Sequence, residues 1–396
     1  MKKALLLLIT LILLSSDFKG QTWAQLADFP STERDDGTVF VINNKAYCGS
    51  GLKVGWVLSG DFHCLDLGTE TWSTVASMPA GKERQYACGF TDGTNGFVFG
   101  GEAFGSDLND LWMYSPSTNS WTAMASKPGN GVRGASCFVI GNIAYVIGGA
   151  FTTNDAINEV WAYDMVGNTW TQKNNLPFTN WRGSGDATNG KGYLLFGMNF
   201  NYGYNRYLME YNPGLDNWTY KSTFAGPGTG KVYANMQAIN NDLVVFAGKD
   251  SLNVYNNQLW TYNLSSNSWL SVSTLTTTLR KGGMGFTNGG TYYYTCGISQ
   301  ADLRLKETWK TDVAVGIKEF EKKETILIYP NPASDIITIR FSKSGLKNLD
   351  YKIIGMKGEV VLEGILNDKN QIEVNALTQG VYHLLIGNLF SRVIIQ

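Results

Sequence analysis

Six tryptophans that recur at an almost constant interval are the feature that most constrains how this chain can fold. They follow one another after 49, 49, 49, 48 and 51 residues, at Trp23, Trp72, Trp121, Trp170, Trp218 and Trp269. A fixed period of roughly 20 to 50 residues is the signature of repeat architectures, in which each repeat buries its apolar face against its neighbours. Most of the chain is therefore predicted to consist of one supersecondary unit that is repeated several times.

Each repeat has the pattern of four short strands. Three repeats share the outline of LWMYSPSTNSW (111–121), in which two tryptophans nine residues apart flank a tyrosine and a turn-forming stretch. A glycine-ended β run such as FVFGG (97–101) precedes this phrase. Charged residues make up only 16% of the chain, whereas aromatics reach 13% and glycines number 45, which is typical of short strands joined by tight turns. We therefore predict an all-β fold.

A four-stranded antiparallel unit repeated in this way predicts a β-propeller, whose sheets face one another around an axis and leave few strand edges exposed. The double glycine, the Trp/Tyr strand, the final tryptophan and an arginine near the first strand resemble kelch repeats over about residues 22–315. The first segment, TWAQLADFP (22–30), has no strands of its own repeat before it, and the last repeat ends after Trp309 without a final strand. We therefore predict a six-bladed kelch β-propeller over residues 21–315, whose sixth blade is closed by residues 22–28 as its outer strand.

Residues 1–20 have the form of a secretory signal peptide. Lys2 and Lys3 precede an apolar run, ALLLLITLILL (4–14), which is too short to span a bilayer as a helix of the mature protein. No later segment is apolar enough for a membrane span. The mature protein is therefore predicted to be exported and to have no integral membrane span.

The composition changes after a charged stretch, GIKEFEKKET (316–325), which we interpret as a linker. Seven short alternating segments follow over residues 326–396 and predict a small seven-stranded β-sandwich. The stretches YPNPASD (329–335), LTQGVYHLLI (377–386) and a terminal RVIIQ resemble the C-terminal sorting domain of the type IX secretion system of Bacteroidetes. This resemblance implies that the type IX secretion machinery is a partner, and that the protein passes through the periplasm and is secreted or held at the outer-membrane surface. An ordinary sandwich module of cell-surface enzymes is the alternative interpretation.

Five cysteines are an odd number for an exported protein, so at least one thiol is unpaired or pairs outside the chain. None has CxxC or metal-ligand spacing. Cys48 and Cys64 could face each other on adjacent strands, a possibility that the sequence leaves open. Cys88 and Cys137 each follow an arginine by four residues at equivalent places in neighbouring repeats, where we interpret them as small buried apolar side chains.

One cation per repeat lies near the predicted first strand. These cations follow one another after 50, 49, 49, 49 and 49 residues, at Arg34, Arg84, Arg133, Arg182, Lys231 and Arg280. Because the first strand of a propeller blade is innermost, we predict that they ring one mouth of the central channel. Loops that reach the same mouth add aromatic rings, of which Tyr202 and Tyr204 lie in the richest loop, NFNYGYNRY (199–207).

Guanidinium forks hold carboxylates, and aromatic rings stack on the apolar faces of sugars. The sequence therefore predicts a binding site for an acidic glycan or an acidic protein ligand. A structural role is equally open, because the same cations could neutralise nearby carboxylates and hold the strands in register. The candidates for that role are Glu33, Asp35, Glu83 and Asp186.

Several function classes have no support in the sequence. A formal net charge of -1 gives no global field that would attract nucleic acid or an anionic membrane. The chain has only two histidines, His63 and His383, too few for a copper site, a catalytic triad or a typical zinc site. We therefore predict no metal and no cofactor. His63 occupies a tryptophan position of the repeat, where we expect it to pack.

One catalytic alternative remains. The repeats resemble those of bacterial kelch sialic-acid mutarotases, which implies that a carboxylate and an arginine near the channel would suffice for activity. Asp186 lies on the same side of its predicted strand as Arg182 and could act as a general base if burial raised its pKa. We favour a non-catalytic binding module, and the alternative is an N-acetylneuraminate mutarotase or epimerase that uses Asp186 and Arg182.

Overall fold

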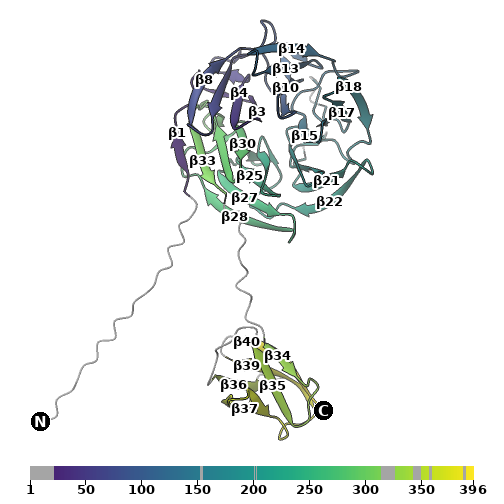
Figure 1. Ribbon diagram of the computed structural model, residues 1–396, viewed down its shortest axis with the longest axis vertical. Coiled ribbons are helices and arrows are strands. Elements are labelled where there is room, and N and C mark those ends of the chain that lie inside the picture. Colours follow the sequence, from purple (N-terminus) through teal and green to yellow (C-terminus); the bar gives the residue numbers. More distant parts are fainter. Residues whose placement is uncertain are drawn as a thin grey trace, which may run out of the picture. The chain divides into compact units, whose positions relative to one another are not determined.

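The computed structural model describes residues 22–151, 155–199, 201, 203–313, 326–341, 349–355, 359–386 and 389–396. Every regular element in these ranges is a β-strand (Figure 1), so the predicted all-β fold is confirmed. The chain divides into two compact units between residues 315 and 316, and each unit is described by itself. The signal peptide (1–20) and linker (316–325) lie outside the described residues, so the predicted domain bounds stay a prediction.

The first unit contains six four-stranded antiparallel sheets arranged around an axis (Figure 1). Each sheet is called a blade here, numbered in the order of its innermost strand. The innermost strands are β3 (Thr38–Ile42), β9 (Cys88–Thr91), β15 (Ser136–Ile140), β19 (Ser184–Thr188), β24 (Asn235–Ile239) and β30 (Met284–Asn288). Each contacts the innermost strand of the next blade, and β30 contacts β3, so the ring is closed.

The other three strands of each blade follow outward from the axis. The second strands are β4 (Lys45–Gly49), β10 (Gly96–Phe99), β16 (Ile143–Ile147), β20 (Lys191–Leu195), β25 (Asp242–Phe246) and β31 (Thr291–Thr295). The third strands are β7 (Phe62–Asp66), β13 (Leu111–Ser115), β17 (Val160–Asp164), β21 (Tyr207–Asn212), β27 (Gln258–Asn263) and β33 (Thr308–Asp312). The outer strands are β8 (Thr71–Val75), β14 (Ser120–Met124), β18 (Thr169–Lys173), β22 (Asn217–Thr223), β28 (Ser268–Thr274) and β1 (Ala24–Leu26).

Blade 6 takes its outer strand from the other end of the propeller sequence. Strand β1 pairs antiparallel with β33, and Gln25 lies opposite Trp309 in the register. Figure 1 shows this pairing as a purple strand beside a green one. The ring of Trp23 packs 4.8 Å from that of Phe246 in blade 5 and 6.2 Å from that of Tyr292 in blade 6, measured between ring centres. The first strand of the described chain therefore fastens the last blade.

The repeated Tyr, Asn and Trp residues form a set of hydrogen bonds between neighbouring blades, called the clamp here. In blade 2 the Tyr114 hydroxyl donates to Asn119 Oδ1 at 2.8 Å, and the same oxygen accepts the backbone N–H of Ala76 in blade 1 at 2.7 Å. The indole N–H of Trp121 donates to the carbonyl of Ala76 at 2.9 Å. Asn119 has a φ of 47°, a left-handed conformation that asparagine tolerates better than most residues. Tyrosine, asparagine and tryptophan thus recur together because the asparagine and tryptophan bond to the preceding blade and the tyrosine positions the asparagine.

The second unit has two sheets around one apolar core. One sheet has the order β34 (Ile326–Tyr329), β35 (Ile336–Phe341) and β38 (Gln371–Glu373). The other has the order β37 (Val360–Ile365), β36 (Asp350–Ile354), β39 (Gly380–Ile386) and β40 (Leu389–Ile395). Ile337 of the first sheet and Leu384 and Val393 of the second belong to one buried cluster. This arrangement has the seven strands and the two facing sheets that the sequence predicts.

Two sequence motifs of the second unit lie against each other. The Asn331 side chain, from the YPNP stretch, donates to the carbonyl of Arg392 at 2.9 Å and accepts the N–H of Ile394 at 2.8 Å. Ala333 forms a parallel bridge with Ile395. The start of this unit therefore holds the terminal strand in place.

Replacement of Trp23 by alanine tests the closing strand. We expect Trp23→Ala to lower the free energy of unfolding of the propeller by about 3 kcal/mol, because it removes a partly buried aromatic ring from the seam between blades 5 and 6. Urea denaturation followed by tryptophan fluorescence measures this change. The matched control is Trp56→Ala, whose side chain is 79% exposed and which should change stability by less than about 0.5 kcal/mol. Equal effects of the two substitutions would contradict the role of Trp23.

Candidate functional site

Six residues at the starts of the innermost strands form a closed cycle of backbone hydrogen bonds. In each, the N–H donates to the carbonyl of the equivalent residue of the preceding blade, over 2.7 to 3.3 Å. The cycle, called the mouth ring here, consists of Asp36, Tyr86, Gly134, Arg182, Tyr233 and Gly282. All six have φ between 56° and 65°. The left-handed conformation costs a residue other than glycine on the order of 1 kcal/mol, and such strain is often retained at functional sites.

The mouth ring surrounds one end of the central channel. A cavity of about 130 Å³ at this end is lined by all six of its residues. Ala135 and Asn235 line both this cavity and a larger one of about 380 Å³, which the innermost strands of the six blades enclose. A ligand at the ring would therefore lie at the entrance of the channel.

Arg182 projects a cation into an aromatic environment at this entrance. Its guanidinium carbon lies 5.0 Å from the ring centre of Tyr86, 4.5 Å from that of Tyr233 and 3.8 Å from that of Trp181. No carboxylate of the described residues lies within ion-pair distance of Arg182, and its Nε is buried without a hydrogen-bond partner. Cation–π contacts of this kind hold a guanidinium in place and leave its N–H groups available.

Two lysines add to the positive charge beside Arg182. Lys281 Nζ lies 4.2 Å from the ring centre of Tyr233. The pKa of Lys249 is lowered by burial and then by the charges of Lys281 and Arg182. The three cations, which come from blades 4, 5 and 6, are therefore close enough to repel one another, and a bound anion would relieve that repulsion.

Asp36 is the acidic member of the mouth ring. Burial and then the neighbouring Asp35 raise the pKa of Asp36 to about 8, against the opposing effects of Lys281 and Arg182. Asp35 is itself paired with Arg304, whose Nε lies 2.7 Å from Asp35 Oδ1. Burial thus favours the neutral, protonated form of Asp36, which leaves the charge of Arg182 and Lys281 less compensated.

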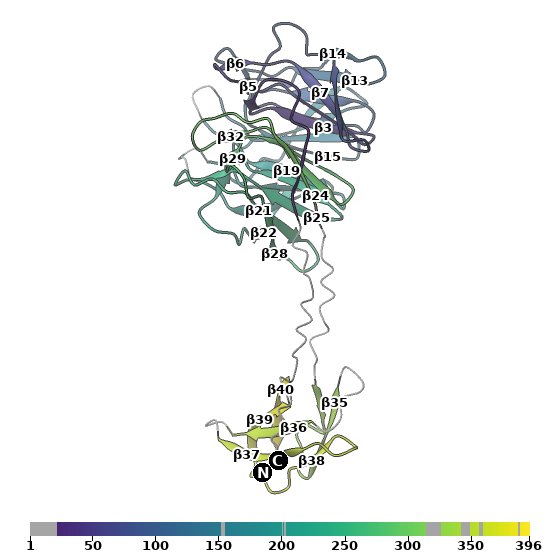
Figure 2. The same ribbon diagram turned by 90° about the vertical axis from the view of Figure 1, so that its left-hand side faces the viewer.

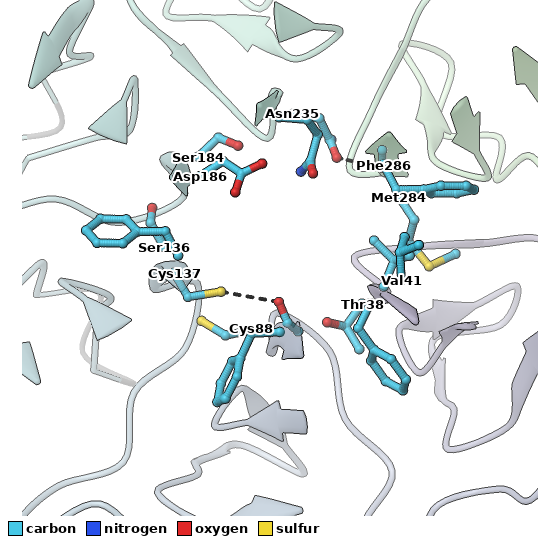
Figure 3. Close-up of a pocket in the computed structure, with 18 of the residues that line it drawn as sticks. Thr38, Val41, Cys88, Ser136, Cys137, Ser184, Asp186, Asn235, Met284 and Phe286 are labelled. Carbon is cyan, nitrogen blue, oxygen red and sulfur yellow. Dashed lines mark hydrogen bonds between the residues drawn. The ribbon is translucent and has the colours of Figure 1, made fainter. Parts of the chain in front are cut away.

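Asp186 lies inside the channel. Figure 3 shows its carboxyl group directed into the opening, with Ser184 on the same strand and Asn235 on the next blade. Its Oδ2 accepts the N–H of Ala238 in blade 5 at 2.6 Å, and its Oδ1 accepts the N–H of Ala187 at 2.7 Å. Burial raises the pKa of Asp186 to about 6, although both amide bonds oppose the shift. The carboxyl group thus ties blade 4 to blade 5 and also faces the channel.

Comparisons with known proteins agree with this architecture. Residues 96–274 match the Attractin/LZTR1 beta-propeller family, and residues 327–395 match the secretion system C-terminal sorting domain family. The chain is a kelch-type β-propeller with a C-terminal sorting domain. A solved structure described as "Structure of YjhT" superposes with a TM-score of 0.61 at 17% identity, covering 72% of this chain and 96% of that one, which shows a shared fold. A comparison with curated proteins found no match.

The sorting-domain match indicates export of the kelch propeller through the type IX secretion system to the cell surface or beyond. Within the described residues, no helix exists that could cross a membrane. They also contain no group of three or more His, Cys, Asp or Glu side chains arranged to hold a metal ion. His63 is buried beside Phe29, with 5.0 Å between ring centres, in a packing position.

The predicted ring of six cations needs correction. Arg34, Arg84 and Arg280 are 0% exposed, and each pairs with a carboxylate of its own blade. Their partners are Asp61, Asp110 and Glu307, at N–O distances of 2.6, 2.7 and 3.1 Å. Lys231 is also buried, and burial lowers its pKa to about 8. These four cations hold the interiors of their blades and are not available to a ligand at the mouth.

Small differences in repeat length explain the error. Successive members of the mouth ring are 50, 48, 48, 51 and 49 residues apart, whereas the aligned cations keep an almost constant spacing. Arg133 therefore falls one position before the ring, where its Nη2 donates to the carbonyl of Phe151 at 3.2 Å. Arg182 falls in the ring itself. Of the six aligned cations, it alone belongs to the mouth ring.

The predicted loop tyrosines have different outcomes. Tyr204 is bridged to Met198 in blade 4 and packs on a buried cluster that contains Trp181. Burial raises the pKa of Tyr204, and the charge of Arg182 opposes this shift, which places the hydroxyl near the guanidinium. Tyr202 lies outside the described residues.

Hairpins project from the blades on the side of the mouth ring. In three blades a short strand just before the innermost strand pairs with the loop that follows the second strand, whereas in blade 2 both short strands lie in that loop. They are β2 (Arg34–Asp35) with β5 (Leu52–Lys53) and β6 (Val57–Leu58), β11 (Glu102–Ala103) with β12 (Ser106–Asp107), β23 (Lys231–Val232) with β26 (Lys249–Asp250), and β29 (Arg280–Lys281) with β32 (Ile298–Ser299). Figure 2 shows β5, β6, β29 and β32 on one side of the propeller.

The tips of these hairpins expose apolar side chains. Trp56, Phe104, Leu252 and Leu303 are the most exposed of them. The Arg304 guanidinium lies 5.1 Å from the Trp56 ring centre, and Gln300 Nε2 donates to the carbonyl of Asn253 at 3.2 Å. These contacts join the tips of blades 5, 6 and 1 into one arc beside the mouth, a surface that the sequence did not predict as a unit.

Proposed function

We propose that the exported kelch propeller binds an acidic glycan or an acidic protein ligand at the mouth ring, without catalysis. The observation that carries this proposal is the guanidinium of Arg182, which lies between tyrosine rings with no carboxylate of the described residues paired to it. A carboxylate of the ligand could form charge-assisted hydrogen bonds with this group without breaking an existing ion pair. Lys281 and Lys249 would strengthen the attraction.

The surroundings of Arg182 suit a ligand larger than a single anion. Tyr86 and Tyr233 line the entrance cavity, where their rings could contact the apolar face of a sugar or a peptide side chain. The exposed arc around Trp56 and Leu303 lies on the same side of the propeller and would add apolar contact area for an extended ligand.

The C-terminal unit completes the proposal. Its sorting-domain family supports a role as the signal that the type IX secretion machinery recognises. In this proposal the propeller is the cargo, and it acts on the outer-membrane surface or in the medium of a Bacteroidetes cell.

Substitution of Arg182 tests the proposed site. We expect Arg182→Gln to weaken binding to arrays of sialylated and uronic-acid glycans and of acidic peptides by roughly 10- to 100-fold, the effect of losing hydrogen bonds to a charged group. Binding by the unchanged protein should also fall as salt rises. The matched control is Arg340→Gln, at an exposed arginine of the C-terminal unit. Unchanged binding by an Arg182→Gln variant with a normal melting temperature would refute the proposal.

The pKa of Asp36 generates a pH dependence. Below about pH 8 Asp36 is protonated and neutral, so Arg182 and Lys281 keep their full attraction for an anion. As the pH rises through about 8, Asp36 becomes negative and the affinity for an acidic ligand should fall. Titration of ligand binding between neutral and alkaline pH measures this loss, and Asp36→Asn should reduce it to the part that comes from deprotonation of Lys249, whose pKa is also lowered. A pH profile that is the same in both proteins would contradict the role of Asp36.

Mutarotation of an acidic sugar is the second candidate. The observation that favours it is the carboxyl group of Asp186, which faces the channel and whose pKa is raised by burial to about 6, a value suited to a general base. Two observations count against it. Arg182, four residues earlier in the chain, lines the entrance cavity, whereas Asp186 lines the larger cavity inside the channel. Both carboxylate oxygens of Asp186 also accept backbone N–H groups.

Exchange between the anomers of N-acetylneuraminate, followed by NMR, separates the two candidates. The binding proposal expects the same exchange rate with and without protein. Acceleration that disappears in Asp186→Asn would favour the enzyme. Arg340→Gln again serves as the control, because its site lies in the other unit.

A further inference from the structure

Two cysteines on neighbouring innermost strands face each other across the seam between blades 2 and 3. Cys88 begins β9, Cys137 lies in β15, and both line the channel. Figure 3 shows the two sulfur atoms side by side at the wall of the opening. The structure holds both as free thiols.

Reciprocal hydrogen bonds hold these sulfur atoms between the strands. Cys88 Sγ donates to the carbonyl of Ala135 on the side of blade 3 at 3.3 Å, and Cys137 Sγ donates to the carbonyl of Gly89 in blade 2 at 3.4 Å. The pKa of the Cys88 thiol is raised first by its hydrogen bond with Cys137 and then by burial. The two thiols are thus close enough to hydrogen-bond to each other, and each is also held by a backbone carbonyl of the neighbouring blade.

Within the described residues, no reciprocal hydrogen bonds of this kind hold the thiols of Cys48, Cys64 and Cys296. Across β4 and β7, Cys48 lies opposite His63, whereas Cys64 lies opposite Tyr47. Cys48 belongs to a core cluster that it shares with Cys296, and Cys64 belongs to a different cluster. Side chains of adjacent residues in a strand point to opposite faces, so the pairing of Cys48 with Cys64 that the sequence left open is not favoured.

We propose that Cys88 and Cys137 form a disulfide that joins blade 2 to blade 3 in the exported protein. Exported proteins meet an oxidising environment, in which paired thiols form and keep disulfides. In the reaction the two S–H bonds break and one S–S bond forms. Two protons and two electrons pass to a disulfide of a thiol oxidant, which is reduced to two thiols by exchange.

The disulfide would stabilise the closed ring of blades. The seam between blades 2 and 3 is otherwise held by packing and hydrogen bonds, and a covalent link there would resist opening of the propeller at that point. Because both residues lie in the channel wall, the link would also fix the distance between β9 and β15 beside the entrance. Both thiols are largely enclosed, so the oxidant must act before the blades close or through the channel.

Thiol counting and peptide mapping test the proposal. The full chain is recovered from an oxidising compartment without reductant, denatured, and treated with N-ethylmaleimide before digestion with trypsin. We expect three of the five cysteines to react, and reduction should bring the number to five. Cleavage after Arg133 separates Cys88 from Cys137, so the disulfide should appear as a linked pair of tryptic peptides whose mass is lower by two hydrogen atoms than the sum of the reduced peptides.

Two variants serve as controls. Cys88→Ser should leave four reactive thiols and no linked peptide, whereas Cys64→Ser should keep the link and leave two reactive thiols. Reduction should lower the melting temperature of the unchanged protein and of Cys64→Ser but not that of Cys88→Ser. Five reactive thiols after equilibration of the unchanged protein with oxidised glutathione would overturn the proposal. A linked pair other than Cys88 with Cys137 would also overturn it.

Discussion

Closure of the ring by β1 is the interaction on which the rest of the propeller depends. Without this strand, blade 6 would expose the edge of β33 and would lose its strand pairing with the segment that leads into blade 1. The mouth ring passes from Gly282 to Asp36 across that same seam. A strand of three residues on the outside of one blade therefore fixes the geometry of a site on the inside of the ring.

Arg182 differs from the buried arginines of the other blades in its electrostatic partners: they pair with carboxylates, whereas Arg182 contacts aromatic rings. A ligand that approached Arg34, whose side chain has no solvent exposure, would have to displace the carboxylate of Asp61, 2.6 Å away. Breaking a buried ion pair typically costs about 3 to 5 kcal/mol. Arg182 is held instead by aromatic faces, which stabilise the cation but accept no N–H hydrogen bond of the strength a carboxylate offers. The same residue type is thus structural in one blade and available in another.

The sequence was sufficient to predict the repeated blades, but the prediction placed most of the cations at the mouth incorrectly. Periodic tryptophans and tyrosines are sufficient to predict an all-β propeller, because the clamp formed around Asn119 recurs with the same residue types and spacing around Asn168 and Asn267. The site depends on single-residue differences in loop length between blades. Such a shift moves a side chain from the interior, as for Arg84, to the ring, as for Arg182. No pattern with a period of a whole repeat can resolve that shift.

The order of residues around the mouth ring explains why the free cation occurs in blade 4. Gly134 precedes Arg182 in the cycle, and a Cβ atom added at Gly134 would lie 3.3 Å from Arg182 Cγ. A side chain at that position would crowd the stem of the arginine, which would have to shift from its place between Tyr86 and Tyr233. Glycine also adopts the left-handed conformation without strain, whereas Arg182 does so at a cost. The strained backbone of Arg182 and the space left by Gly134 thus occur side by side in the mouth ring.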